Sequence, residues 1–216
     1  MTALAARLIR CDRAATAAEF ALVLPLLLIM LFGIIDVGRF MWEVNQAEKA
    51  TQVGARMAVV TTPVSPGLVE ADFASATTPA GELIPATALG ELKCTSTACA
   101  CIGSGACPVD DLTVNSDAFD KIVARMAMIK PGITADNVEI SYRGSGFGFA
   151  GSAPSGPGSG GGGAGPPETM EISPLVTVAL KDVDFTPITS LLFATISLPS
   201  FTTTMTAEDS AGEYSN

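Results

Sequence analysis

The sequence predicts an α+β protein, in which a long N-terminal helix spans a membrane and packs its distal half on a small antiparallel sheet. An uncharged apolar run of sixteen residues, 20–35, predicts the membrane segment. Apolar and small residues at helical spacing continue the helix to Val60. Short segments of alternating polarity follow after residue 137, and strands that come after a helix favour an α+β arrangement.

The membrane part is expected over about residues 15–42 and the whole helix over residues 15–60. The apolar run supplies about 24 Å at roughly 1.5 Å per residue, so its flanks must complete a hydrocarbon core of roughly 30 Å. Arg7, Arg10 and Arg13 precede the run, and this basic flank is expected in the cytoplasm, with the chain after about Asp36 outside. No small-x-small cleavage site follows the run directly, so the helix is expected to stay in the membrane.

Glu19 lies one residue before the apolar run, and an ordinary single-pass anchor does not explain it. A carboxylate at the mouth of a membrane helix costs several kcal/mol unless it has a partner. The ordered residues around it are Ala17-Ala18-Glu19-Phe20-Ala21-Leu22-Val23-Leu24-Pro25-Leu26-Leu27-Leu28 and Phe32-Gly33-Ile34-Ile35-Asp36-Val37-Gly38-Arg39.

These two runs resemble the TadE family of pseudopilins, which belong to the tight-adherence (Flp-type) pilus assembly systems of bacteria. The resemblance is strong over about residues 13–60 and much weaker over residues 170–208. It implies a pilin-like fold and a minor pilin or pseudopilin that takes part in assembly of a tight-adherence, type IV-like pilus and so in cell adhesion.

The resemblance also implies that the chain is made as a prepilin and cut by a prepilin peptidase. Glu19, followed by Phe20, resembles the glutamate at the fifth position of mature pilins, which places the cut between Ala14 and Ala15 and removes the basic leader 1–14. Glycine is the usual residue before that bond, and Ala14 departs from it. The new amine and Glu19 can then neutralise each other between neighbouring helices, where lipid offers no water.

The same resemblance implies a single-pass protein of the bacterial inner membrane, with a cytoplasmic N-terminus and a periplasmic C-terminal domain. The implied partners are the prepilin peptidase, other pilins or pseudopilins, inner-membrane pilus assembly proteins and membrane lipid. Whether the subunit enters the fibre is left open. The alternative hypothesis is a membrane-anchored periplasmic binding or adhesion module with an uncleaved anchor helix.

The charge distribution and composition exclude several function classes. Residues 61–216 carry seventeen acidic and six basic side chains, so nucleic acid is not expected as a partner, because phosphate binding needs clustered Lys and Arg. The chain contains no histidine, which removes His-dependent catalysis and His-ligated metal sites. No residue set suggests an enzyme, a catalytic residue, a cofactor site or a metal site.

Small residues form a narrow stripe on the distal half of the expected helix. Ala47, Ala50, Gly54 and Ala58 recur at helical spacing and allow a neighbouring surface to approach closely. That neighbour is either the domain's own sheet or a helix of another subunit. Thr62-Pro63 is expected to end the helix.

The extracytoplasmic domain is expected over residues 61–216. Residues 61–116 are interpreted as irregular structure, followed by a helix over residues 117–129. Strands are predicted over the segments 138–142, 172–180 and 196–205. An apolar connection over residues 188–193, which can form a helical turn, precedes the last of them. The Gly/Pro/Ser tract 144–167 predicts a flexible insertion rather than a phosphate-binding loop, because no lysine follows it at the required position.

Four cysteines lie close together in this domain: Cys94, Cys99, Cys101 and Cys107. In an oxidising compartment such an even set predicts a loop with two disulfide bonds. Three pairings exist, and the one that joins Cys99 to Cys101 would close a strained ring, so two pairings remain. A four-thiolate zinc site is less favoured because paired Cys-x2-Cys motifs are absent. Cys11 precedes the apolar run and is expected to be an unpaired cytoplasmic thiol.

Asp36 and Arg39 stand at i and i+3 where the helix leaves the membrane, so an ion pair is predicted on one face. Two interpretations remain open, an interfacial pair that positions the helix and a docking point for a partner's membrane helix. The acidic pairs Asp110-Asp111 and Asp182/Asp184 lack the spacing of a calcium loop and are interpreted as solvated carboxylates.

Overall fold

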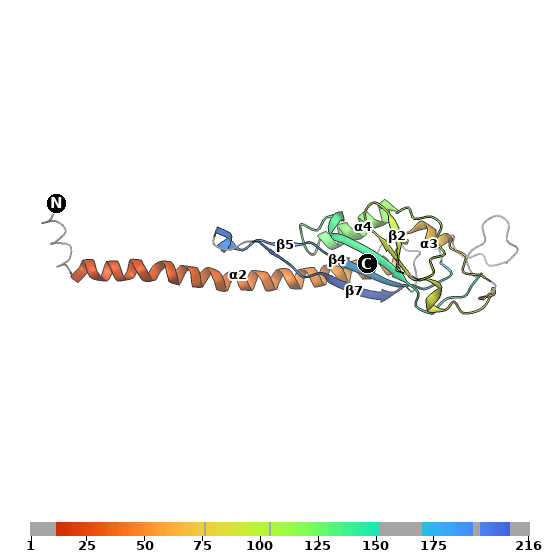
Figure 1. Ribbon diagram of the computed structural model, residues 1–216. Coiled ribbons are helices and arrows are strands. Elements are labelled where there is room, and N and C mark those ends of the chain that lie inside the picture. The colour runs from red at the N-terminus through yellow and green to blue at the C-terminus, as the bar shows by residue number, and fades with distance from the viewer. Residues whose placement is uncertain (1–11, 76, 104, 152–169, 192–194, 208–216) are drawn as a thin grey trace. The chain divides into compact units, whose positions relative to one another are not determined.

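The computed structural model describes residues 12–75, 77–103, 105–151, 170–191 and 195–207 (Figure 1). The chain divides into two compact units. The first consists of the chain up to Glu43 together with Asp184–Ser197, and the second of Val44–Val183 together with the chain from Leu198 onward. The two units are described separately below.

Helix α2, Asp12–Val60, is a single run of 49 residues that contributes to both units. At roughly 1.5 Å per residue it is about 70 Å long. Pro25 lies inside it without interrupting it. The helix ends where predicted. The Thr61 N–H makes a last helical bond to the Met57 carbonyl, which the Thr61 hydroxyl also contacts, and Pro63 has no N–H to continue the ladder.

In the first unit α2 exposes large apolar side chains around its circumference. Leu22 is 79% exposed, Leu26 70% and Met30 68%, and these are three of many such residues between Phe20 and Trp42. Within the described residues α2 is the one helix long and apolar enough to cross a membrane, judged by its length and composition. An exposed apolar surface of this size suggests membrane anchoring, because its contact with water would be strongly unfavourable.

The second unit contains a five-stranded antiparallel sheet in the order β2-β1-β3-β4-β7. Its strands are β1 Glu91–Cys94, β2 Cys99–Ile102, β3 Val138–Arg143, β4 Leu175–Leu180 and β7 Phe201–Thr206. The α+β prediction is supported at this level. The interpretation of residues 61–116 as irregular was wrong in part, because this segment contains β1 and β2, a helix α3 (Pro66–Glu70) and a 3-10 turn η1 (Ala86–Ala88).

The last predicted strand, over residues 196–205, is divided between the two units. Ile196–Ser197 forms β6, which pairs with β5, Asp184–Phe185, in the first unit, whereas Phe201–Thr206 forms β7 on the main sheet. Pro199 lies between them and cannot donate to a strand ladder, which is a physical reason for the break.

The core of the second unit lies between the sheet, the distal part of α2 and helix α4, Ser116–Ala127. Alternate residues of the central strands are buried, and α4 contributes Phe119, Ile122 and Met126. The Asn115 side chain caps α4 by accepting from the Ala118 N–H at 3.1 Å. A capping box closes the 3-10 turn η2, Ala135–Asn137, directly before β3.

The small-residue stripe of α2 lies against this core. Ala47, Ala50, Gly54 and Ala58 are all buried. A Cβ atom on Gly54 would lie 2.7 Å from the Met126 sulfur and 3.4 Å from a methyl carbon of Val178. The close approach that the stripe permits is therefore to α4 and β4 of the same chain.

The beginning of the glycine-rich tract is ordered, although residues 144–167 were expected to be flexible. The Ile84 N–H donates to the Gly148 carbonyl at 3.0 Å, and the Phe149 N–H donates to the Glu171 carbonyl at 3.2 Å. Gly148 has φ +130°, and a Cβ there would meet the Glu171 carbonyl oxygen at 2.3 Å. Backbone pairing thus orders residues 144–151, while the rest of the predicted insertion, from residue 152, lies outside the described residues.

Replacing Gly54 by leucine should destabilise the second unit by about 1–3 kcal/mol, because the new side chain must displace Met126 from a filled core. Chemical unfolding of the full chain in detergent measures this cost. Gln52→Leu is the matched control, since Gln52 is exposed on the same helix. Equal unfolding curves for the two variants would contradict the packing described here.

Candidate functional site at the mouth of the apolar helix

The predicted processing residues lie at the beginning of α2. Ala14 and Ala15 fall within its first turns, and the leader 1–11, with Cys11, lies outside the described residues. Glu19 is exposed, and Phe20 is 65% exposed. Both side chains are accessible to a partner, and their roles remain predictions.

At the other end of the apolar run, Asp36 is a buried carboxylate with four partners. It is 7% exposed. One carboxylate oxygen accepts from the Ile188 N–H at 2.7 Å, and the other accepts from the Thr189 N–H at 2.9 Å and from the Thr189 hydroxyl at 2.7 Å. Arg39 lies 3.3 Å from the first oxygen, which is the ion pair predicted from the i, i+3 spacing.

The donors come from the beginning of a short helical turn. The turn η3, Ile188–Leu191, follows Pro187, and the first N–H groups of any helical turn have no partner within it. Asp36 accepts two of them, so it acts as a capping side chain supplied from α2, about 150 positions away in the sequence. Charge-assisted hydrogen bonds of this kind are stronger than those between neutral groups.

Aromatic contacts join the same two segments one turn further along α2. The rings of Phe40 and Phe185 meet edge to face, with centroids 5.5 Å apart. The Arg39 guanidinium lies 5.5 Å from the Phe185 ring centre, within range of a cation–π contact. Phe185 is 2% exposed, so the β5–β6 hairpin is fixed to α2 by apolar burial as well as by Asp36.

A cavity of about 560 Å³ lies within the first unit, between α2 and the hairpin. Its lining is mostly apolar, and Asp36 and two threonines are the polar side chains in it. The lining residues are Gly33, Asp36, Val37, Phe40, Phe185, Pro187, Thr189, Thr195 and Ile196.

The hairpin partners of Asp36 were missed in the sequence. Asp36 was linked to Arg39 alone, and the segment 188–193, in which a helical turn was allowed and η3 is found, was given no partner. A usable signal was present: no charged residue occurs between Asp184 and Glu208, so this segment shares the absence of charge with the apolar run. Polarity alone, however, does not identify which carboxylate would cap its helical turn.

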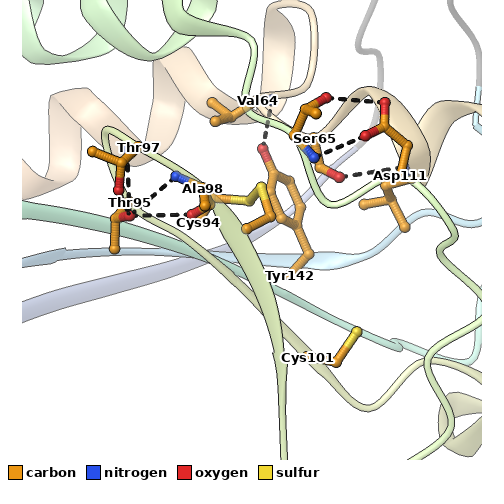
Figure 2. The surroundings of a disulfide bond; sticks show 12 residues. Val64, Ser65, Cys94, Thr95, Thr97, Ala98, Cys101, Asp111 and Tyr142 are labelled. Carbon is orange, nitrogen blue, oxygen red and sulfur yellow. Dashed lines mark hydrogen bonds between the residues drawn. A yellow bond between two sulfur atoms is a disulfide. The ribbon is translucent and has the colours of Figure 1, made fainter.

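The four clustered cysteines form two disulfide bonds, Cys94–Cys99 and Cys101–Cys107. This is one of the two pairings left open above. Cys94 and Cys99 face each other in the β1–β2 ladder, so their bond closes the edge hairpin of the sheet. Figure 2 shows Cys94 beside the ring of Tyr142, whose hydroxyl accepts from the Val64 N–H at 3.0 Å. Burial raises the pKa of Tyr142, so the phenol stays protonated.

Two carboxylates in the second unit, Glu139 and Asp111, bind neighbouring side chains of the same unit. Glu139 on β3 contacts Lys181 at 2.5 Å and Lys93 at 3.2 Å. Partial burial raises the pKa of Glu139, but the hydrogen bonds and charges of the two lysines outweigh it and hold the pKa below its usual value. Two hydrogen bonds from Thr113 lower the pKa of Asp111. Among the described residues, no cluster of three or more His, Cys, Asp or Glu side chains could hold a metal ion.

Comparison with protein families identifies the N-terminal part of the chain. Residues 14–56 match the family described as TadE-like protein. This match confirms the resemblance drawn from the residues around Glu19, and it covers the Asp36–Arg39 pair and most of α2. No curated protein and no solved structure matches the chain.

The two disulfides should be detectable in the mature protein. Non-reducing peptide mass spectrometry is expected to show Cys94 linked to Cys99 and Cys101 linked to Cys107. Reduction should loosen the β1–β2 edge, since the cross-link limits the freedom of the unfolded loop. Alkylation of all four thiols without prior reduction, or a different linkage map, would contradict this assignment.

Replacing Asp36 by alanine should release the hairpin from α2, because the Ile188 and Thr189 N–H groups lose their acceptor. An orphaned buried donor costs about 1–3 kcal/mol, so amide exchange at these two positions should quicken roughly ten- to hundredfold. Hydrogen exchange of the full chain in detergent measures the exchange rates at Ile188 and Thr189. Arg39→Gln is the control and should change exchange less, because the Arg39 side chain is 43% exposed and its loss leaves the three hydrogen bonds from Ile188 and Thr189 to Asp36 in place. Unchanged exchange in Asp36→Ala would show that the carboxylate does not hold the hairpin.

Proposed function

We propose that this chain, TadE-like over residues 14–56, is a minor pilin or pseudopilin that takes part in assembling a tight-adherence pilus. The family match carries this proposal, because a TadE-like segment suggests involvement in a tight-adherence pilus system. The exposed apolar surface of α2 supports it, since a subunit of this kind is stored in a membrane and assembled through its helix.

The chain is made as a prepilin in the bacterial inner membrane. Its basic leader stays in the cytoplasm, and the second unit lies in the periplasm, where disulfide bonds form readily. A prepilin peptidase cuts between Ala14 and Ala15. The family match begins at residue 14, beside this bond.

After cleavage, Glu19 lies one helical turn from the new amine. In lipid an unpartnered carboxylate and an unpartnered ammonium are both costly, so the two charges favour neighbours that neutralise them. The amine of one subunit and Glu19 of the next therefore form the contact that aligns helices during assembly. The partners are other pilins or pseudopilins, inner-membrane assembly proteins and the surrounding lipid.

Processing is tested by determining the N-terminus of the protein extracted from membranes of cells that contain the peptidase. The expected mature chain begins at Ala15 and has lost residues 1–14. A full-length chain that retains Arg7 and Arg10 in such cells would reject the prepilin and favour an anchored binding or adhesion module.

The role of Glu19 is tested in the same cells by counting pili. Glu19→Ala should leave the subunit in the membrane and greatly reduce piliation, because the helix amine loses its neutralising partner. Glu48→Ala is the matched control, an exposed glutamate on the distal part of the same helix. Equal piliation by the two variants would remove Glu19 from the proposed mechanism.

A further inference from the structure

We propose that the β5–β6 hairpin, described over residues 184–191 and 195–197, is a second membrane-contacting element that lies in the lipid interface beside α2. This inference rests on the proposed membrane location of α2 and adds a lipid-binding surface from a part of the chain outside the family match. The lipid is recognised through its acyl chains, by apolar side chains rather than by headgroup charge.

The position of the hairpin along α2 is the first argument. Phe185 contacts Phe40, while Ile188 and Thr189 bind Asp36, so the hairpin advances along α2 toward its apolar part. Thr195 and Ile196 on its returning strand line the same cavity as Gly33, which belongs to the apolar run 20–35. Hairpin and apolar run therefore lie side by side.

The exposed surface of the hairpin is the second argument. Ile188 is 52% exposed and Ile196 is 48% exposed. At the same level of α2, Ile34 is 62% exposed and Val37 is 65% exposed. Ile196 and Val37 line the same cavity, so exposed apolar side chains of the hairpin lie beside those of α2, and residues 185–197 carry no charge.

The partners of Asp36 are the third argument. The apolar run supplies about 24 Å of a roughly 30 Å core, so Asp36 is drawn to the edge of the hydrocarbon region. Water is scarce there, and a carboxylate needs donors from the protein. Ile188 and Thr189 supply three, and Arg39 completes the set. The hairpin thereby supplies the hydrogen-bond donors that replace water around Asp36. It must therefore lie at the same depth in the membrane as Asp36.

The depth is limited by the backbone of the hairpin. Irregular backbone exposed to lipid does not occur within the hydrocarbon core, because its polar groups lack partners there. An element that lies at the boundary between headgroups and acyl chains, buried by about 5–10 Å, avoids this cost. The hairpin is therefore an interfacial contact and not a second span.

The test places a fluorophore on the full chain, with Cys11 replaced by serine, in phosphatidylcholine vesicles. Labels go to Ile188→Cys and Ile196→Cys, with Leu26→Cys as the lipid reference and Met128→Cys as the water reference. Met128 is 72% exposed and follows α4, which carries Asp120, Lys121 and Arg125. Quenching is measured with iodide in the water and with a doxyl group near the top of the acyl chains.

Labels at Ile188 and Ile196 should show doxyl quenching at least as strong as the label at Leu26 and several-fold above that at Met128, because the doxyl group lies at the depth of the interface. Their iodide quenching should be several-fold below that at Met128. Quenching of both hairpin labels as at Met128 would overturn the inference. Shielding from both quenchers would also overturn it, since protein would then cover the hairpin. If the Leu26 label itself were open to iodide, the membrane span of the proposed function would fail instead.

Discussion

Helix α2 presents large apolar side chains to its surroundings over residues 20–35 and buries a stripe of small residues over residues 47–58, so one continuous backbone must be stable in two environments. In the first part, lipid or a neighbouring helix has to cover the apolar surface. In the second part, α4 and the sheet cover it from within the chain. The rest of the structure depends on this division, because the second unit covers its part of α2 from within the chain and the first unit leaves most of its part exposed.

Asp36 lies where the two requirements meet. A charged carboxylate is disfavoured in lipid and useful at a water boundary, and the chain accommodates it with three hydrogen bonds from Ile188 and Thr189 and a pair with Arg39. Phe185 adds apolar burial against Phe40. The hairpin thus depends on α2 for its position, and Asp36 depends on the hairpin for its solvation. Through this mutual dependence, a stretch of sequence outside the family match helps to fix the structure at the end of the apolar run.

Much of the fold could be predicted from the sequence, because periodicity is a local signal. The length of α2, helix α4 and strands β3 and β4 all follow from the spacing of apolar residues. Strands β1 and β2 were missed because each has four residues and stands in a segment rich in Thr, Ala and Gly. The order in residues 144–151 was missed because it comes from backbone pairing with residues 82–84 and 171–173, which composition does not encode.

The candidate site could be predicted less completely. The residues around Glu19 form a linear motif, and Asp36 with Arg39 is a local pair, so both were visible in the sequence. The capping of η3 by Asp36 joins residues more than 150 positions apart, and nothing local specifies which turn a carboxylate will cap. The stripe at Ala47, Ala50, Gly54 and Ala58 predicted a close contact without its identity, because small residues suit a sheet and a helix equally.

The claim that α2 changes its surroundings near Asp36 is tested most directly by thiol reactivity along the helix. Single cysteines at Leu26, Met30, Ile34 and Gln52 in the full chain, with Cys11 replaced by serine, would be treated with a membrane-impermeant maleimide in sealed vesicles. All four native residues are exposed in the structure, so only lipid should separate them. The account predicts that Gln52→Cys reacts rapidly from one side of the membrane while the other three stay unreactive. Comparable reaction at all four positions would contradict it.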